Sequence, residues 1–146
     1  MAKHISNMDE LAKAFQPVML GMVDELAERV YQTLNYFLQE YYNSYAPKSY
    51  RRQYDFLRSA VKVKPKVMGN KVVASVYIDT NYMDNYYNAT GEQVASWANR
   101  GLHGGLDTGG KTPHVWDDTM KETIENGELL KLAVDYLKRK GFSVRN

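Results

Sequence analysis

The sequence predicts an α+β fold with a long N-terminal helix, an antiparallel β-sheet that contains a hairpin, and C-terminal helices. Three observations lead to this prediction. Apolar residues recur every three or four positions in the first third of the chain, alternate with lysines in the middle, and regain helical spacing near the end. A chain of 146 residues can bury a core of its own, so we expect one domain over 1–146.

The first helix is predicted to begin at Met8. Asn7 suits the N-cap position, and Asp9 and Glu10 follow in the first turn, where negative charge is favourable. Pro17 should either kink this helix or begin a second one, because a helix interior does not accommodate proline well. The amphipathic pattern then continues through Val23, Leu26, Val30, Leu34, Phe37 or Leu38, Tyr41 and Tyr45.

The end of this helix is predicted at Tyr45-Ala46-Pro47, because the residue before a proline avoids helical angles. At about 1.5 Å per residue, the part beyond Pro17 would be roughly 40 Å long. That length exceeds the width of a domain of this size. We therefore expect part of the helix to project, or to lie along a neighbouring subunit.

A β-hairpin is predicted in the middle of the chain. The first strand would have one apolar and one basic face, since Val61, Val63, Pro65 and Val67 alternate with Lys62, Lys64 and Lys66. Pro65 cannot donate a ladder hydrogen bond, which places it at an edge or a bulge. Gly69 and Asn70 suit a turn, and KVVASVYID reads as the returning strand. The lysines would also discourage edge-to-edge aggregation.

A short helix over roughly 92–100 should follow, because Thr90 and Gln93 have the spacing of a capping box and Gly101 suits a helix end. The glycine-rich loop at about 101–111 is predicted to be flexible.

Two further helices are expected at 114–125 and 128–140. Asn126-Gly127 would separate them, and Gly141 would close the second.

Composition excludes several kinds of site. The absence of cysteine removes disulfides and thiolate zinc sites. No apolar run is long enough to span a membrane and no signal peptide is evident, so we expect a cytoplasmic origin without membrane contact.

The net charge is only +2, but the segment 48–71 carries eight basic residues against the single acid Asp55. Such segregation favours contact with an acidic partner or with copies of the same chain.

Candidate catalytic and ligand-binding motifs are weak. Gly105–Thr112 fits the pattern of a phosphate-binding loop, but no buried strand precedes it and Pro113 follows directly. His103 and His114 do not have the spacing of a hydrolytic zinc site, and a solvated or hydrogen-bonded pair is the simpler interpretation. Serines and carboxylates form no recognisable constellation. We therefore expect no enzyme, no catalytic residue, no cofactor and no metal.

Tyrosine is unusually frequent, with twelve in the chain. Tyrosines near Arg51 and Arg52 could stack bases in a small nucleic-acid-binding protein that uses the 48–71 segment. They could equally anchor a protein interface, where tyrosine, tryptophan and arginine are enriched. The absence of a nucleic-acid module signature favours protein contact.

These residues resemble those of the head–tail joining, or tail-completion (tail terminator), proteins of long-tailed bacteriophages. The resemblance lies in PKSYRRQYDFLRSAVKV, in the hairpin ending VYIDTNYMDNYY, and in TPHVWDDTMKETI with its closing helix. It covers about Pro47 to Tyr136. The insertion between Asn88 and Thr112 departs from the compact stretch that many members carry there.

The resemblance implies a structural virion protein at the head–tail junction. Copies would assemble in the host cytoplasm into a ring, usually of six, that contacts the tail tube protein and the neck or head-completion protein. Lys62, Lys64 and Lys66 would face either the DNA that passes through the lumen or an acidic neighbouring subunit. As the candidate protein-interface residues, which lie in and around the glycine-rich loop, we select Tyr82, Tyr86, Tyr87, Trp97, Leu102, Leu106 and Trp116.

Overall fold

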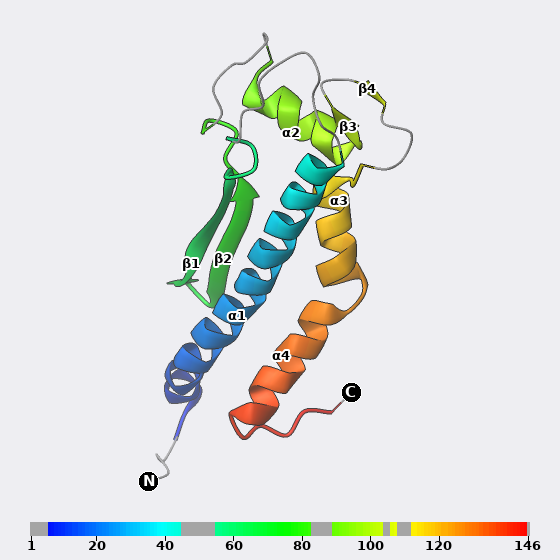
Figure 1. Ribbon diagram of the computed structural model, residues 1–146. Coiled ribbons are helices and arrows are strands. Elements are labelled where there is room, and N and C mark those ends of the chain that lie inside the picture. The colour runs from blue at the N-terminus through cyan, green and yellow to red at the C-terminus, as the bar shows by residue number, and fades with distance from the viewer. Residues whose placement is uncertain (1–5, 45–54, 83–88, 104–105, 108–111, 146) are drawn as a thin grey trace.

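The computed structural model describes residues 6–44, 55–82, 89–103, 106–107 and 112–145 (Figure 1). It has the α+β architecture that the sequence predicts, with a long first helix, an antiparallel hairpin and C-terminal helices. In chain order the elements are α1 (Met8–Asn43), β1 (Ala60–Met68), β2 (Lys71–Ile78), α2 (Gly91–Asn99), β3 (Leu102–His103), β4 (Leu106–Asp107), α3 (Val115–Met120), η1 (Lys121–Glu125) and α4 (Glu128–Arg139).

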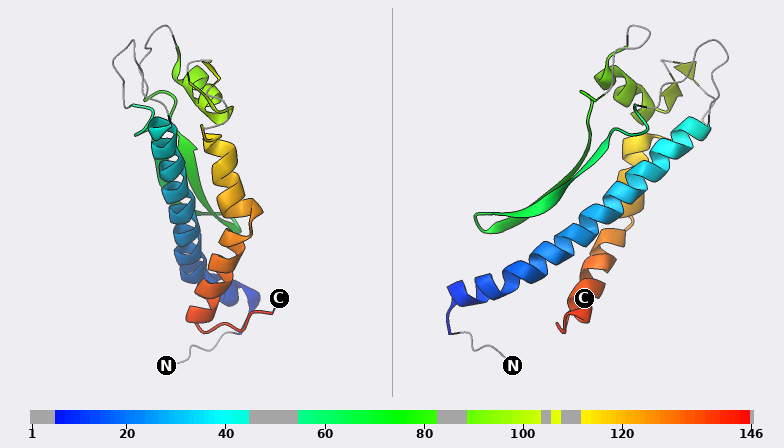
Figure 2. Two further views of the ribbon diagram at one scale, coloured as in Figure 1. Left: turned by 45° about the vertical axis from the view of Figure 1, so that its right-hand side comes forward. Right: turned by 60° about the vertical axis from the view of Figure 1, so that its left-hand side comes forward.

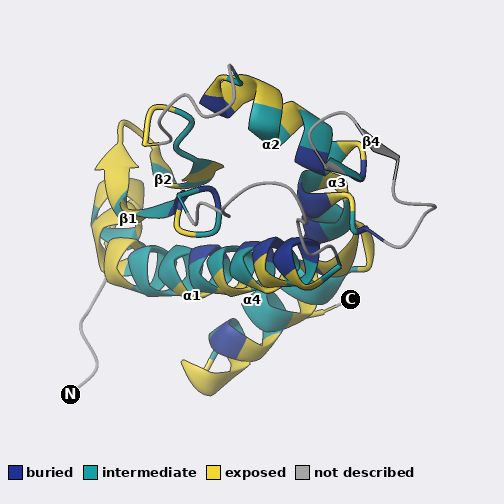
Figure 3. Ribbon diagram, turned by 45° about the horizontal axis from the view of Figure 1, so that its top comes forward, coloured by how far each residue is buried: buried dark blue, intermediate teal, exposed yellow. Residues whose placement is uncertain are grey.

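Helix α1 organises the fold. The hairpin β1–β2 lies along one side of it, and the chain α3–η1–α4 runs along another (Figures 1 and 2). Helix α2 and the short strands β3 and β4 lie across its C-terminal end. Buried residues concentrate toward that end, whereas the hairpin tip is exposed (Figure 3).

Helix α1 begins where predicted. The Asn7 side chain accepts a hydrogen bond from the Glu10 backbone N–H at 2.9 Å. Pro17 does not divide the helix, which runs for 36 residues and so spans about 54 Å. Its first turns are inclined to the remainder (Figure 2). The helix ends at Asn43, just before the predicted stop, and the Ser44 N–H donates to the Glu40 carbonyl at 3.0 Å.

The hairpin has the predicted turn and the predicted irregularity. Strands β1 and β2 pair antiparallel from Ala60 opposite Ile78 to Met68 opposite Lys71. Gly69 adopts a φ of +61° in the turn, a conformation that costs glycine little. The register shifts between Val63 and Lys66, which confirms the bulge expected around Pro65.

The faces of β1 differ from the prediction. Ala60 packs against the core, and Lys62 on the same side reaches the acidic side chains of α1. Val63 is instead 40% exposed. The expected division into an apolar and a basic face is therefore wrong, because acids on α1 draw Lys62 inward and the bulge interrupts the alternation.

Helix α2 carries the predicted capping box. The Gln93 N–H donates to Thr90 Oγ1 at 3.2 Å, and the Thr90 N–H donates to Gln93 Oε1 at 2.9 Å. Gly101, with φ +74°, follows the helix end. Within the glycine-rich segment, β3 and β4 pair as a two-residue ladder. The flexible loop was predicted over about 101–111; part of it is thus ordered as β3 and β4, whereas 104–105 and 108–111 lie outside the described residues.

The C-terminal helices separate where predicted, at Asn126 and Gly127, and Gly127 adopts a φ of +79°. A π-helical turn, η1, precedes this break and was not predicted. Thr119 of α3 and Thr123 of η1 are fully buried. Their hydroxyls donate to the carbonyls of Val115 and Thr119 at 2.7 and 2.6 Å, which satisfies their polar atoms locally.

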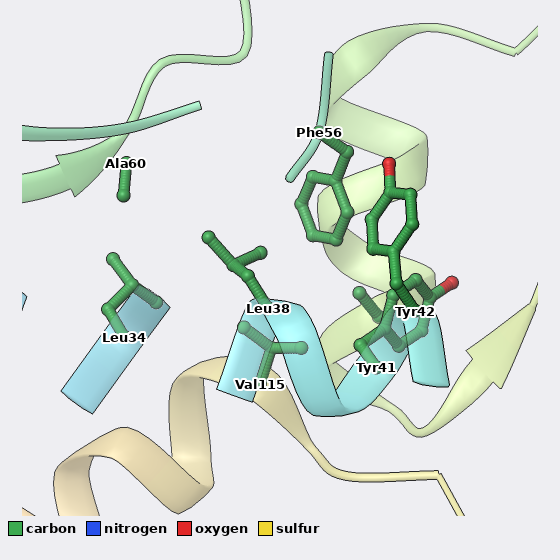
Figure 4. Close-up of a cluster of buried hydrophobic side chains, with 8 residues drawn as sticks. Leu34, Leu38, Tyr41, Tyr42, Phe56, Ala60 and Val115 are labelled. Atoms are coloured by element: carbon green, nitrogen blue, oxygen red, sulfur yellow. The ribbon is translucent and has the colours of Figure 1, made fainter. Parts of the chain in front are cut away.

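The core lies between the C-terminal half of α1, the segment before β1, and the start of α3 (Figure 4). Tyr41 meets Phe56 edge-on with the ring centroids 5.5 Å apart, and Tyr42 stacks on the same ring at 6.4 Å. These two tyrosines are buried. They stabilise the core, which confirms the predicted position of Tyr41 on the apolar face of the helix. The buried members of the core are Leu34, Leu38, Tyr41, Tyr42, Phe56, Ala60, Ala98 and Val115.

Candidate interaction surfaces

One side of the hairpin is apolar and has no cover within the described part of the chain. Because side chains alternate along β2 and the pairing is known, the side facing away from α1 can be assigned from register. Val63, Val73 and Tyr77 on this side are 40%, 36% and 44% exposed. We call it the outer hairpin face, formed by Val61, Val63, Lys66, Met68, Lys71, Val73, Ser75 and Tyr77.

The sheet itself is unusually small for such a long hairpin. Among the described residues it has only the strands β1 and β2, and α1 packs against one face of it. An isolated two-stranded hairpin is marginally stable in water, and contiguous exposed apolar side chains mark interaction surfaces. The outer hairpin face is therefore a candidate interface.

The hairpin also concentrates positive charge. Arg58, Lys64, Lys66 and Lys71 are exposed and form no ion pair with any described residue. Because no acidic residue lies between Arg58 and Ile78, these four cations give this surface a positive potential.

Lys62 is the exception among the hairpin lysines. Its ammonium lies 2.8 Å from Asp24 Oδ1 and 3.0 Å from Glu28 Oε2, and its side chain is only 18% exposed. The hydrogen bond to Asp24, and next the one to Glu28, raises the pKa of Lys62 above its ordinary value of 10.5. Lys62 therefore ties the hairpin to α1, and its charge is neutralised within the subunit.

A second surface lies on α1 beside η1. Five α1 residues at helical spacing form one stripe, and Glu122 of η1 stands at its side. The open groove between them has a volume of about 540 Å³. Tyr36 in this groove is 58% exposed. We call it the α1 groove, lined by Arg29, Gln32, Thr33, Tyr36, Phe37 and Glu122.

The α1 groove lies in an acidic neighbourhood. The segment 114–130 carries five acidic residues against the single cation Lys121. Glu122 and Glu125 are exposed and form no ion pair among the described residues, whereas Glu128 pairs with Arg29 at 3.2 Å. The groove thus combines the exposed Tyr36 ring with the Glu122 carboxylate, which forms no ion pair among the described residues.

The predicted interface residues near the glycine-rich loop are only partly assembled. Tyr82 is 50% exposed, and Trp97 and Leu102 are half-buried. Trp116 packs against the core, so much of its ring is already covered within the subunit. Tyr86 and Tyr87 lie outside the described residues, as does the side chain of Leu106.

The end of the molecule that carries these residues is held by polar contacts. Asn99 of α2 accepts a hydrogen bond from the Asp117 N–H at 2.8 Å and donates to the Asp117 carboxylate at 3.3 Å. His114 Nδ1 lies 3.0 Å from the Asn99 carbonyl, which is the hydrogen-bonded role that the sequence favoured. The Tyr41 hydroxyl donates to the Leu102 carbonyl at 2.8 Å. These contacts fix α2 and β3 over the end of α1.

No described group of three or more histidine and carboxylate side chains could hold a metal ion. Most of the Gly105–Thr112 motif lies outside the described residues; its last member, Thr112, is buried two residues before His114, the N-cap of α3. Within the part of the chain that the structure describes, no helix is long and apolar enough to cross a membrane.

Sequence reasoning missed Val73, Tyr77 and the α1 groove as surface features. The signal was present in KVVASVYI, because valines and a tyrosine occupy both faces of this strand. One helix can cover only one of those faces. Helical periodicity does not distinguish a residue of an open groove, such as Tyr36, from one in a packed stripe.

In comparison with known proteins, the model of one family, described as YomN, matches residues 7–139. This match covers every helix and strand described above. No curated protein and no solved structure matches the chain.

Proposed function

The chain belongs to the YomN family and is thereby associated with bacteriophages, and from this premise we propose that it is a structural protein of the virion. In this proposal copies assemble in the host cytoplasm into a ring of about six. The ring terminates or completes the tail at the head–tail junction and joins it to the neck. Its partners are other copies, the tail tube protein and the neck or head-completion protein.

The observation that carries this proposal is the uncovered outer hairpin face. A subunit with an apolar sheet face, a concentration of cations and a helix of 36 residues has surfaces suited to repeated protein contacts. The resemblance to head–tail joining proteins supplies the place of assembly. The fold is consistent with that class, because it too combines a long N-terminal helix, a hairpin and closing helices.

The surfaces described above would then contact different partners. The outer hairpin face and the α1 groove are suited to contacts between copies, since both lie along the length of the subunit. The end formed by α2 and β3, with Tyr82, Trp97 and Leu102, would contact the tail tube or the neck. Lys64 would face the lumen and DNA in transit, whereas Lys62 is paired within the subunit and Lys66 belongs to the outer hairpin face.

The test is electron microscopy of the purified chain, alone and mixed with tail tubes from a phage that carries a protein of this family. We expect closed rings, or caps on the ends of the tubes. Monomers under both conditions, together with salt-sensitive binding to DNA, would reject this proposal in favour of the nucleic-acid alternative.

A further inference from the structure

We propose that the outer hairpin face of one copy docks onto the α1 groove of the next copy, which makes the interface between subunits head-to-tail. This inference rests on the proposed ring and specifies its contact surfaces. The hairpin packs on the side of α1 that carries Asp24 and Glu28, whereas the groove follows Arg29, Thr33 and Tyr36. The two surfaces therefore face different directions and can be occupied in one subunit at the same time.

Charge complementarity is the first argument. The outer hairpin face presents Lys66 and Lys71, which have no ion pair among the described residues. The α1 groove presents Glu122, and Glu125 lies three residues further along η1. Arg29 also lines the groove, but its guanidinium already pairs with Glu128. Opposite unpaired charges on the two surfaces favour contact and set its register.

Apolar complementarity is the second argument. The hairpin face exposes Val63, Val73 and Tyr77. At the groove, the Tyr36 side chain is 58% exposed. Docking would remove these side chains from water together, and tyrosines of this kind often contribute most of the binding energy of an interface.

The same charges disfavour the symmetric alternatives. Two outer hairpin faces brought together would place Lys66 and Lys71 against the lysines of the other copy, and two grooves would oppose their glutamates. Like charges at an interface are costly. A contact between two different surfaces repeats from copy to copy, and it generates a ring when the rotation closes.

The experiment uses two full-length variants that each disable one surface. Tyr77→Asp puts a charge on the hairpin face, and Tyr36→Asp puts one in the groove. Both positions are exposed, so both variants should fold, which circular dichroism and thermal melting would verify. Met8→Asp, at a site that is 76% exposed and on neither surface, is the matched control. Mass photometry and analytical ultracentrifugation report the size of the assemblies.

We expect each tyrosine variant alone to self-associate about tenfold or more weakly than the wild type, and the control to assemble normally. A mixture of the two variants should give one-to-one heterodimers and nothing larger, because the hairpin of the Tyr36→Asp chain still fits the groove of the Tyr77→Asp chain. Dimers of the Tyr36→Asp chain alone would mean that hairpins pair with hairpins, which overturns the inference.

A charge exchange provides an independent measurement. Lys66→Glu should weaken assembly, and adding Glu122→Lys in the same chain should restore it. If the wild type forms rings that survive all of these substitutions, the assignment of surfaces is wrong while the proposed function stands. If the wild type remains monomeric and does not cap tail tubes, the proposed function fails and this inference fails with it.

Discussion

The Tyr136 ring of α4 occupies the space that a side chain at Gly21 of α1 would need. A Cβ atom added at Gly21 would overlap the Tyr136 hydroxyl oxygen and lie 3.1 Å from Cζ. Tyr136 is buried at this crossing, and Arg139 one turn further along pairs with Glu25 of α1 at 2.7 Å. The absence of a side chain at Gly21 therefore permits the close approach of the two helices.

This contact predicts that Gly21→Ala destabilises the protein. Alanine in a helix interior normally stabilises by about 1 kcal/mol relative to glycine, but overpacking a tight contact costs about 1–3 kcal/mol. We expect a net loss of about 1 kcal/mol in the free energy of unfolding, measured by urea denaturation. The loss should shrink when Tyr136→Phe is also present, because phenylalanine lacks the overlapping hydroxyl. An equal loss in both backgrounds would contradict the steric explanation.

The Lys62 ion pairs predict that their contribution to the free energy of unfolding is lost at alkaline pH. Because the pKa of Lys62 is raised in the folded protein by Asp24 and Glu28, its contribution is fully present below pH 10.5. It is lost as the pH rises through the higher folded-state value. Lys62→Met should lower the free energy of unfolding by about 1 kcal/mol or less at pH 7, since both acids are well exposed and screened.

The measurement is the difference in melting temperature between Lys62→Met and the wild type from pH 7 to 11.5. The difference should narrow at the alkaline end. Lys64→Met is the matched control, because Lys64 is exposed and forms no ion pair with described residues. Tyrosine titration affects all three proteins and cancels in the comparison. A constant difference across this pH range would be inconsistent with an ionic role for Lys62.

Local signals in the sequence predicted the element boundaries well. The Asn7 cap, the Thr90 and Gln93 capping box, the Gly69 turn and the Gly127 break each depend on chemistry within a few residues, and each is present. These features need no knowledge of the rest of the fold. The sequence does not show whether α1 continues through Pro17. The helix tolerates this proline because Pro17 and Lys13 are both exposed, so water can solvate the Lys13 carbonyl that loses its hydrogen-bond partner.

The faces of the hairpin could not be predicted from the sequence. Valines and lysines alternate in β1, so either face could have turned inward. Asp24 and Glu28 decide the orientation from a helix more than thirty residues away. The helical pattern predicts Tyr41 on the apolar face of α1, but it does not reveal that Tyr42 packs in the core as well, because a tyrosine with a partner for its hydroxyl packs in a core as readily as at an interface.

The exposed Lys64 predicts salt-dependent retention on DNA by the assembled protein, if the ring lumen contains this side chain. Replacing Lys64 with alanine should weaken binding and reduce the slope of log affinity against log salt by about 0.9, as expected for one phosphate contact on duplex DNA. A Lys131→Ala variant, at another exposed lysine, has the same net charge and serves as the control. Equal effects of both variants would indicate a general charge effect instead of a lumen site.

For the glycine-rich loop we predict that a deletion leaves the subunit folded but prevents it from joining tails to heads. A Cβ atom on Gly101 would lie 3.3 Å from the Thr112 carbonyl oxygen, so the two ends of the loop are close together. Deleting 104–110 leaves three residues to connect them, which is a length common among tight connections. The deletion variant should therefore melt close to the wild type and still self-associate through the hairpin and groove. If residues of the loop contact the tail tube or the neck, the deletion variant should fail to join tails to heads in a complementation assay. Particles assembled at the normal yield would show that this loop has no part in joining.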